Sequence, residues 1–303
     1  MTAAAIVLIV ITGIYGLVIG SFLNVVVYRV PASIPLTRES RCPSCDAKIR
    51  WWQNVPVLGW LALRGRCAFC GAAISARYPA VEALTGILFA SVAAGVAFSR
   101  PLDARPVDGR LWLGSAEFWG ILVTMLVFLS ISIALTLIDL DTRRLPNAIV
   151  LPGWVTMIVL LLVTTVLTGL LPAEGGLEAG QPAVAGTWAG IDWGPFVRAV
   201  IGGVALFVFY FIVRLISPRG MGGGDVKLAG LAGTMMAWFG WGPFIVGAFA
   251  AFALGGLFGI AMMLIGRARR KDAIPFGPWM LTGAWTGIIV GEPVSRWYLG
   301  LLS

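Results

Sequence analysis

The sequence predicts an all-α membrane protein with about eight transmembrane helices. Three observations support this: 59% of the residues are hydrophobic, only 12% are charged, and long apolar runs recur along the chain. A hydrocarbon core about 30 Å thick needs roughly 20 apolar residues for each helical span, and soluble domains do not repeat such runs. The predicted spans lie near residues 4–27, 80–98, 116–138, 148–171, 195–216, 226–241, 244–265 and 278–300.

The order of polar and apolar segments divides the chain into three parts. Residues 1–27 are predicted to be a retained first helix, because no basic segment precedes the apolar run and no obvious cleavage site follows it. Residues 28–79 form the longest polar insertion, and residues 80–303 the main membrane domain. The division between 226–241 and 244–265 depends on Trp241-Gly242-Pro243 alone, so the number of spans is predicted to within one.

The net charge of +8 indicates the topology of the chain, not a nucleic-acid partner. Basic residues gather in particular loops, and no basic patch interleaved with aromatic residues is present. Since basic loops stay in the cytoplasm, we expect residues 28–79 to be cytoplasmic and the N-terminus to face outward. By the same rule and the alternation of spans, the loops near 139–147, 214–227 and 267–271 are expected inside, and those at 99–115 and 172–194 outside.

All four cysteines lie in the first cytoplasmic segment, as the pairs Cys42-Pro43-Ser44-Cys45 and Cys67-Ala68-Phe69-Cys70. Two CxxC pairs supply the four thiolates that a tetrahedral structural zinc prefers. Gly65 and Gly71 provide turn freedom around the second pair. Two disulfides would be the alternative, but the cytoplasm is reducing. We therefore predict a small domain held together by zinc, whose closed coordination shell leaves no hydrolytic role for the metal.

Acidic residues are the main candidates for catalysis. The chain contains no histidine, which excludes histidine-dependent nucleophiles, histidine-ligated zinc hydrolases and histidine acid–base chemistry. Ionisable groups at membrane depth are costly and usually mark function. The candidates at span ends are Asp139, Asp141 and Asp225.

Asp139 and Asp225 are both predicted at cytoplasmic ends of spans, so their carboxylates can meet. Gly222, Gly223 and Gly224 precede Asp225 and permit positive φ and the close approach of another chain segment. Two carboxylates that share one proton can activate water and protonate an amine product.

Two further residues are candidates for shaping this site. Lys227 follows Asp225 by two positions. Asp141 lies about 200° around a helix from Asp139, so only one of the two can face Asp225. Asp139 lies deeper, whereas Asp141 is placed to pair with Arg143 and Arg144 at the surface.

Taken alone, these residues leave other interpretations open. Asp225 could be a helix cap, and Asp139 could pair with a neighbouring arginine. Eight helices with membrane carboxylates also describe ion-coupled transporters, whose acidic residues belong near the bilayer midplane. A scaffold protein without catalysis is the third possibility, and it predicts that amide replacements of the aspartates have no effect.

Several motifs together resemble those of the bacterial prepilin peptidases, also called type IV leader peptidases. This family has one aspartate seven positions before a Pro-Asn or Pro-Asp pair, which here is Asp139, and a second in a GxGD motif, which here ends at Asp225. The match continues in the segment 20–31, the two cysteine pairs, and Arg77-Tyr78-Pro79 with Glu82. The resemblance thus covers nearly the whole chain and makes residues 80–303 a membrane aspartic protease domain.

The resemblance implies a peptidase that removes the basic leader of type IV prepilins or type II secretion pseudopilins, cutting after a glycine at the cytoplasmic face of the bacterial inner membrane. Members with the cysteine-bearing domain are also described as methylating the new N-terminal residue, with S-adenosylmethionine as the methyl donor. The expected partners are therefore a prepilin and membrane lipid. Nucleic acid is not among them.

Overall fold

The computed structural model describes residues 3–98, 113–171, 187–188, 191–217, 221–266 and 275–301. In these ranges the chain is mostly helical, and the strands are the short antiparallel pair β1 (Thr187–Trp188) and β2 (Ile191–Asp192). The prediction of an all-α fold is confirmed. The basic segment 267–271 and most of the two predicted outer loops lie outside the described residues.

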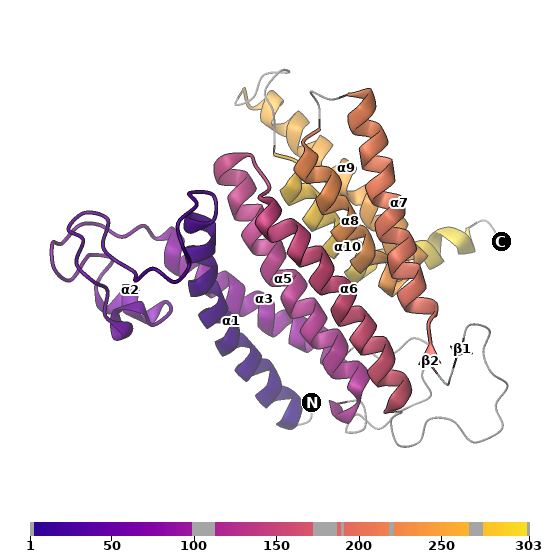
Figure 1. Cartoon of the computed structure of the whole chain (residues 1–303), viewed down its shortest axis with the longest axis horizontal. Coiled ribbons are helices and arrows are strands. Elements are labelled where there is room, and N and C mark those ends of the chain that lie inside the picture. The colour runs from indigo at the N-terminus through magenta and orange to yellow at the C-terminus, as the bar shows by residue number, and fades with distance from the viewer. Residues whose placement is uncertain are drawn as a thin grey trace. The chain divides into compact units, whose positions relative to one another are not determined.

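Each of the eight predicted apolar runs forms a helix (Figure 1). The long helices are α1 (Ala3–Arg29), α3 (Arg77–Phe98), α5 (Ala116–Thr142), α6 (Asn147–Leu170), α7 (Gly194–Ile216), α8 (Gly223–Phe239), α9 (Trp241–Leu264) and α10 (Gly277–Gly300). Two short helices, η1 (Trp51–Asn54) and α2 (Leu58–Ala62), lie in the polar segment between α1 and α3.

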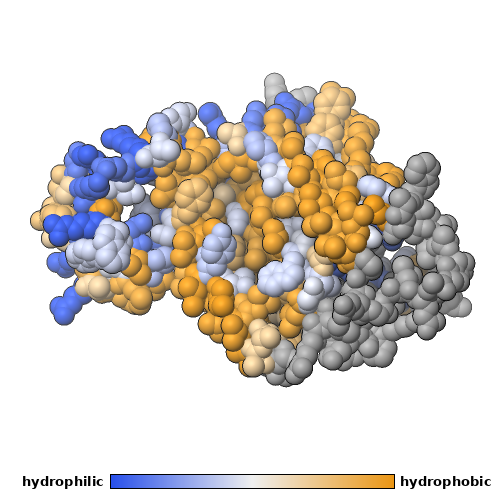
Figure 2. Space-filling view, turned by 60° about the horizontal axis from the view of Figure 1, so that its bottom comes forward, coloured by the Kyte–Doolittle hydropathy of each residue, from blue (hydrophilic) through white to orange (hydrophobic). Residues whose placement is uncertain are grey.

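Six helices in the described part of the chain are long and apolar enough to cross a membrane: α1, α3, α5, α6, α7 and α9. Helix α8 has only 17 residues, and α10 contains Glu292 and Arg296. Large apolar side chains are exposed along these helices, for example Ile11, Ile245 and Phe249, and Figure 2 shows hydrophobic residues over much of the helical surface. Such a surface fits a lipid environment, because lipid accepts apolar side chains that water would not.

The chain divides into two compact units, which share α5. The first contains residues 1–114 and 121–134, and the second contains residues 115–120 and 135–303. In the first unit α1 packs on α3. A Cβ atom added to Gly20 would lie 2.7 Å from the Cα of Glu82, and one added to Gly16 would lie 2.6 Å from the Cβ of Phe89. Glycine at these positions therefore lets the two helices approach closely.

Helix α8 is the centre of the second unit. It contacts α6, α7, α9 and α10, which surround it in Figure 1, and its residues from Leu228 to Ala237 are all buried. A Cβ atom on Gly203 of α7 would lie 2.1 Å from Thr234 Oγ1, so the contact between α7 and α8 requires a glycine. Because α8 is surrounded by protein, its first turn has a fixed place among its neighbours.

The break between α8 and α9 occurs at Gly240, one residue before the segment on which the predicted division depended. Gly240 has φ 146° and ψ 170°, a conformation that only glycine adopts readily. Pro243 lies in the first turn of α9, where its missing N–H breaks no helical hydrogen bond. Gly240 therefore separates the two helices, and Pro243 starts the second one.

Candidate active site and candidate metal site

Asp139 lies in the last turn of α5 and is buried, with 5% of its surface exposed. Its Oδ2 accepts a hydrogen bond from the backbone N–H of Gly277, at 3.1 Å. Arg143 then takes a left-handed conformation and its N–H bonds to the carbonyl of Asp139, which ends the helix. Asp141 is exposed. The helical spacing therefore separates the two aspartates as expected, and Asp139 is the one that faces the protein interior.

Asp225 is the third residue of α8. Its Oδ2 accepts the N–H of Gly222 at 3.0 Å, so the carboxylate closes the start of the helix from inside it and is not the N-cap, which is Gly222. Burial raises the pKa of Asp225 to about 6; the N–H of Gly222 opposes this rise, and the charge of Asp139 adds to it. Two carboxylates near one another cannot both stay ionised as easily as isolated ones.

Leu145 connects the surroundings of the two aspartates. A Cβ atom added to Gly224 would lie 2.7 Å from the Cβ of Leu145, and one added to Gly277 would lie 3.5 Å from its Cδ2. Leu145 thus packs between the residue before Asp225 and the residue that binds Asp139. The structure therefore brings together the two predicted aspartates, which are 86 positions apart in the sequence.

The three predicted glycines have close neighbours. None of them adopts the left-handed region that glycine uniquely tolerates. A Cβ atom on Gly223 would lie 2.0 Å from Nη1 of Arg214, and one on Gly222 would lie 3.0 Å from Oδ2 of Asp225. With Leu145 against Gly224, all three positions are restricted by packing. Two properties were expected of these glycines: positive φ and the close approach of another chain segment. The structure shows the close approach but not the positive φ.

Lys227 is the fifth residue of α8, and its side chain reaches α6. Its Nζ donates a hydrogen bond to Oδ1 of Asn147, at 2.8 Å. Asn147 is the first residue of α6 and belongs to the Pro146-Asn147 motif. This bond ties the start of α6 to the start of α8.

Sequence reasoning missed the parts played by Gly277 and Leu145. Gly277 was one of many glycines at the start of an apolar run, yet Gly277-Pro278 opens α10, and free N–H groups gather in the first turn of a helix. The Gly-Pro start of a helix therefore indicated that the N–H of Gly277 was a possible hydrogen-bond donor, but not that Asp139 was its acceptor. Leu145 had no distinguishing signal, since an apolar residue in an interhelical loop is common.

The four cysteines form one cluster in the first unit. One sulfur from each of Cys42, Cys45, Cys67 and Cys70 lies within 4.8 Å of all the others, and all four are free thiols. The Sγ atoms of Cys42 and Cys70 are 3.9 Å apart. Four sulfurs bound to one zinc ion at about 2.3 Å would lie about 3.8 Å apart. The cluster can therefore hold a tetrahedral metal ion with little rearrangement.

The two cysteine pairs are built as equivalent turns. The N–H groups of Asp46 and Gly71 bond to the carbonyls of Cys42 and Cys67, four positions earlier, at 2.9 and 3.0 Å. Both residues have positive φ, 53° for Asp46 and 71° for Gly71. Gly65 also has positive φ, 68°. Gly65 and Gly71 thus adopt the positive φ values that were expected of glycines in these turns.

The backbone around the cysteines favours thiolates. N–H groups of Cys70 and Phe69 lower the pKa of Cys67 to about 6, and N–H groups of Ser44 and Cys45 lower the pKa of Cys42. The N–H of Ala47 acts in the same direction on Cys45, but burial and the three neighbouring thiols raise the pKa of Cys45 to about 12. Four adjacent thiolates need a cation to balance their charge, which fits the chemistry of a zinc site.

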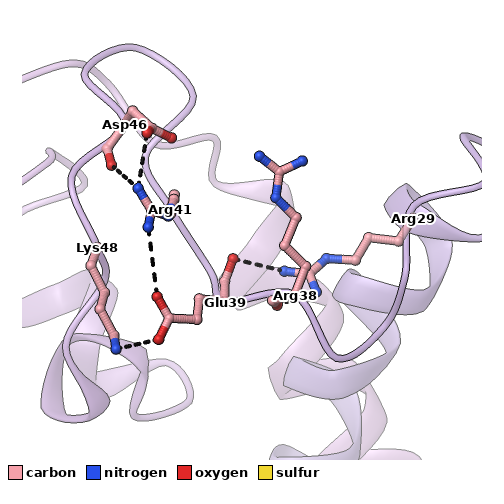
Figure 3. A network of polar contacts seen from close by, with 6 residues as sticks. All are labelled: Arg29, Arg38, Glu39, Arg41, Asp46 and Lys48. Atoms are coloured by element: carbon pink, nitrogen blue, oxygen red, sulfur yellow. Dashed lines mark hydrogen bonds and ion pairs between the residues drawn. The ribbon is translucent and has the colours of Figure 1, made fainter.

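A network of ion pairs and hydrogen bonds holds the loop that carries the first cysteine pair (Figure 3). Arg29, at the end of α1, is 7% exposed and donates to the carbonyl of Leu36 at 2.9 Å and to that of Arg38. Arg41 pairs with Asp46 at 2.9 Å, and Glu39 pairs with Lys48. The exposed pairs contribute little to stability, so the buried Arg29 is the main anchor of this loop.

Comparison with known proteins gives two family matches. Residues 14–96 match the bacterial peptidase A24 N-terminal domain, and residues 126–260 match the type IV leader peptidase family. Proteins named prepilin leader peptidase/N-methyltransferase are similar over nearly their full length. The one from Aeromonas hydrophila is 33% identical, over 94% of this chain and 92% of the relative.

Two other relatives of the same name give similar values. The protein of Stutzerimonas stutzeri is 32% identical, over 94% of this chain and 92% of its own. That of Pseudomonas aeruginosa is 30% identical, over 95% and 92%. No solved structure matches the chain.

Proposed function

Since this chain belongs to the type IV leader peptidase family, we propose that it is the membrane aspartic peptidase of a bacterial inner membrane that removes the leader of type IV prepilins or type II secretion pseudopilins. The resemblance inferred from the sequence motifs is thereby confirmed. The observation that carries the proposal for the catalytic site is the packing of Leu145 between Gly224 and Gly277, which brings the surroundings of Asp225 and Asp139 together.

In the proposed mechanism the two carboxylates share one proton. Asp225 holds this proton, because burial raises its pKa to about 6. Asp139 acts as the general base, with one oxygen held by the N–H of Gly277 and the other directed to water. The water attacks the peptide carbonyl as Asp139 takes its proton, and Asp225 then protonates the leaving amine.

Lys227 and the three glycines shape this site in the proposal. The bond between Lys227 and Asn147 fixes the start of α8 relative to α6. Gly222, Gly223 and Gly224 keep side chains away from the start of α8, where Arg214 and Leu145 already lie. Asp141 stays at the surface and takes no part in proton transfer.

We place the site at the cytoplasmic face. Arg143 and Arg144 directly follow α5 and are exposed, and Arg214 lies beside Gly223. Basic residues beside the ends of membrane helices favour the cytoplasmic side. A prepilin with a basic leader before an apolar helix would then present its scissile bond, after a glycine, at the level of Asp139 and Asp225.

In this proposal the N-terminal part of the chain, residues 14–96, supplies the second activity, which is N-methylation. Relatives that share it are named N-methyltransferases as well as peptidases. We infer that this chain methylates the newly exposed N-terminal residue and that S-adenosylmethionine provides the methyl group. The four cysteines would hold zinc in a structural role, because four thiolates fill its coordination shell.

The placement of the aspartates favours a peptidase over the two other classes. Asp139 is in the last turn of its helix and Asp225 in the first turn, whereas an ion-coupled transporter needs carboxylates near the bilayer midplane. A scaffold protein has no use for a buried carboxylate such as Asp139 beside the half-buried Asp225, which is costly to maintain.

The proposed function is tested by incubating the full-length protein in detergent with a prepilin and following the gel mobility and mass of the product. We expect the loss of the leader at a single bond after a glycine. With S-adenosylmethionine present, the product should gain the mass of one methyl group. A prepilin that stays intact, under conditions in which a relative from Pseudomonas aeruginosa processes it, would contradict the proposal.

A further inference from the structure

Tyr210, on α7, is a buried tyrosine whose hydroxyl group has no hydrogen-bond partner among the residues that the structure describes. Only 1% of its surface is exposed. Buried tyrosine hydroxyls usually find a partner, because an unsatisfied polar group inside a protein is costly. The fully enclosed hydroxyls without a partner in the described residues are those of Thr124 and Thr168. The hydroxyl of Tyr210 is not among these fully enclosed groups.

Tyr210 faces the start of α8. At one end of the contact between α7 and α8, Gly203 lies against Thr234, and at the other end Arg214 lies against Gly223. Tyr210 is seven positions after Gly203 and four before Arg214, so all three share one side of the helix. The phenol also lies within electrostatic range of the carboxylate of Asp225. The register and the charge both place Tyr210 beside the first turn of α8.

Aromatic contacts fix the ring of Tyr210 and connect it with the other aspartate. Its ring stacks on that of Phe252, with centroids 5.5 Å apart, and contacts that of Phe276 at 6.2 Å. Phe276 precedes Gly277, whose N–H binds Asp139. A ring held by two neighbours points its hydroxyl in a defined direction at little entropic cost. Tyr210 thus adjoins both halves of the aspartate pair.

The hydroxyl is not used by either aspartate. Asp225 accepts its hydrogen bond from Gly222, and Asp139 accepts its bond from Gly277. A hydrogen-bond donor that is oriented but unpaired in the free protein can stabilise negative charge that develops on the substrate in the transition state. Such donors have their largest effect on this developing charge. Peptide hydrolysis develops this charge on the carbonyl oxygen.

We propose that Tyr210 is a further catalytic residue, whose hydroxyl donates a hydrogen bond to the oxygen of the scissile carbonyl. This inference rests on the proposed peptidase function. The water oxygen bonds to the carbonyl carbon, the carbonyl π electrons move to its oxygen, and the water proton passes to Asp139. Tyr210 stabilises the resulting oxyanion without losing its own proton. The C–N bond then breaks as the carbonyl re-forms, and the proton of Asp225 passes to the amine.

The test is the substitution Tyr210→Phe in the full-length protein, because phenylalanine keeps the contacts with Phe252 and Phe276 and removes only the hydroxyl. We expect kcat for prepilin cleavage to fall by about 10²- to 10³-fold, the usual effect of losing one oxyanion donor, with KM changed by less than about threefold. Tyr298→Phe, at an exposed tyrosine of α10, is the matched control and should leave both constants unchanged.

Two results would overturn the assignment of Tyr210. One is a Tyr210→Phe protein whose kcat stays within about threefold of the wild-type value. The other is a loss of activity accompanied by a lower unfolding temperature and a raised KM, which would indicate packing alone. Failure of the proposed function is a separate outcome, because the wild-type protein and its Tyr298→Phe control would then also leave the prepilin intact.

Discussion

The backbone N–H of Gly277 binds Oδ2 of Asp139 at 3.1 Å, which joins the first turn of α10 to the last turn of α5 across 138 positions of sequence. One oxygen of the buried carboxylate is thereby fixed, and the other is left for a reacting group. The second aspartate has the same arrangement, since Gly222 holds one oxygen of Asp225. Each carboxylate of the proposed pair is thus oriented by a backbone donor.

The bond between Gly277 and Asp139 gives the first prediction. In Gly277→Ala the new Cβ would lie 2.7 Å from Oδ2 of Asp139, so the carboxylate must move. We expect prepilin cleavage to slow by at least about tenfold, because small displacements of a catalytic group are costly. Gly256→Ala, on α9, is the matched control, since a Cβ there meets nothing within 4 Å.

The rates of both variants are measured in detergent, together with their unfolding temperatures. A Gly277→Ala protein as active as Gly256→Ala would show that the position of Asp139 does not depend on this bond.

The pKa of Asp225 predicts how activity depends on pH. Burial raises this pKa to about 6, compared with about 3.9 for an ordinary aspartate. In the proposed mechanism the active form carries one shared proton, so activity should decline as pH rises through about 6 and the proton is lost.

Initial rates of cleavage between about pH 4.5 and 9 measure the effect. We expect an alkaline limb with an apparent pKa well above that of an ordinary aspartate, which belongs to the pair and not to one residue. A rate that is constant from pH 5 to 8 would show that no carboxyl group of this kind limits catalysis.

The cysteine cluster predicts a bound metal. Purified full-length protein should contain about one zinc ion per chain, because one set of four thiolates binds one tetrahedral ion. Cys45→Ser should lose most of this zinc, while Ser44→Ala, within the same turn, should keep it. Since the cysteines and the aspartates belong to different units of the chain, we expect loss of zinc to affect methylation and stability before cleavage.

Metal analysis of the three purified proteins measures the zinc content, and the two activities are assayed on the same samples. A Cys45→Ser protein that retains its full zinc content would contradict the assignment of these four ligands.

Much of this fold was predictable because lipid limits what a chain can do. A span must be helical, apolar and long enough to cross the bilayer, so the predicted runs 116–138 and 195–216 correspond closely to α5 and α7. The cysteine cluster was predictable for a similar reason, since metal coordination requires a particular spacing of ligands. The number of membrane spans was less certain because α8 is short and enclosed by protein.

The aspartates of the site could be predicted, but not their surroundings. Asp139 and Asp225 are charged residues at the ends of apolar runs, which makes them conspicuous in the sequence. Gly277, Leu145 and Tyr210 resemble ordinary residues of membrane helices and loops, and their roles depend on which helices pack together. Contacts across such long sequence separations follow from tertiary packing, which local patterns do not determine.

The proposed mechanism requires that Asp139 and Asp225 perform the hydrolysis and that Asp141 does not. Replacing aspartate by asparagine keeps the shape of the side chain and removes the titratable carboxyl group. Proton-transfer groups typically contribute factors of about 10²–10⁴ to the rate, so each of the two catalytic replacements should abolish detectable cleavage.

The most direct measurement is prepilin processing in membranes by the Asp139→Asn, Asp225→Asn and Asp141→Asn proteins, at equal levels of inserted protein. We predict that the first two leave the leader attached and that Asp141→Asn, at an exposed position, retains a substantial fraction of wild-type activity. An inactive Asp141→Asn beside an active Asp139→Asn would contradict the assignment of Asp139 as the catalytic residue.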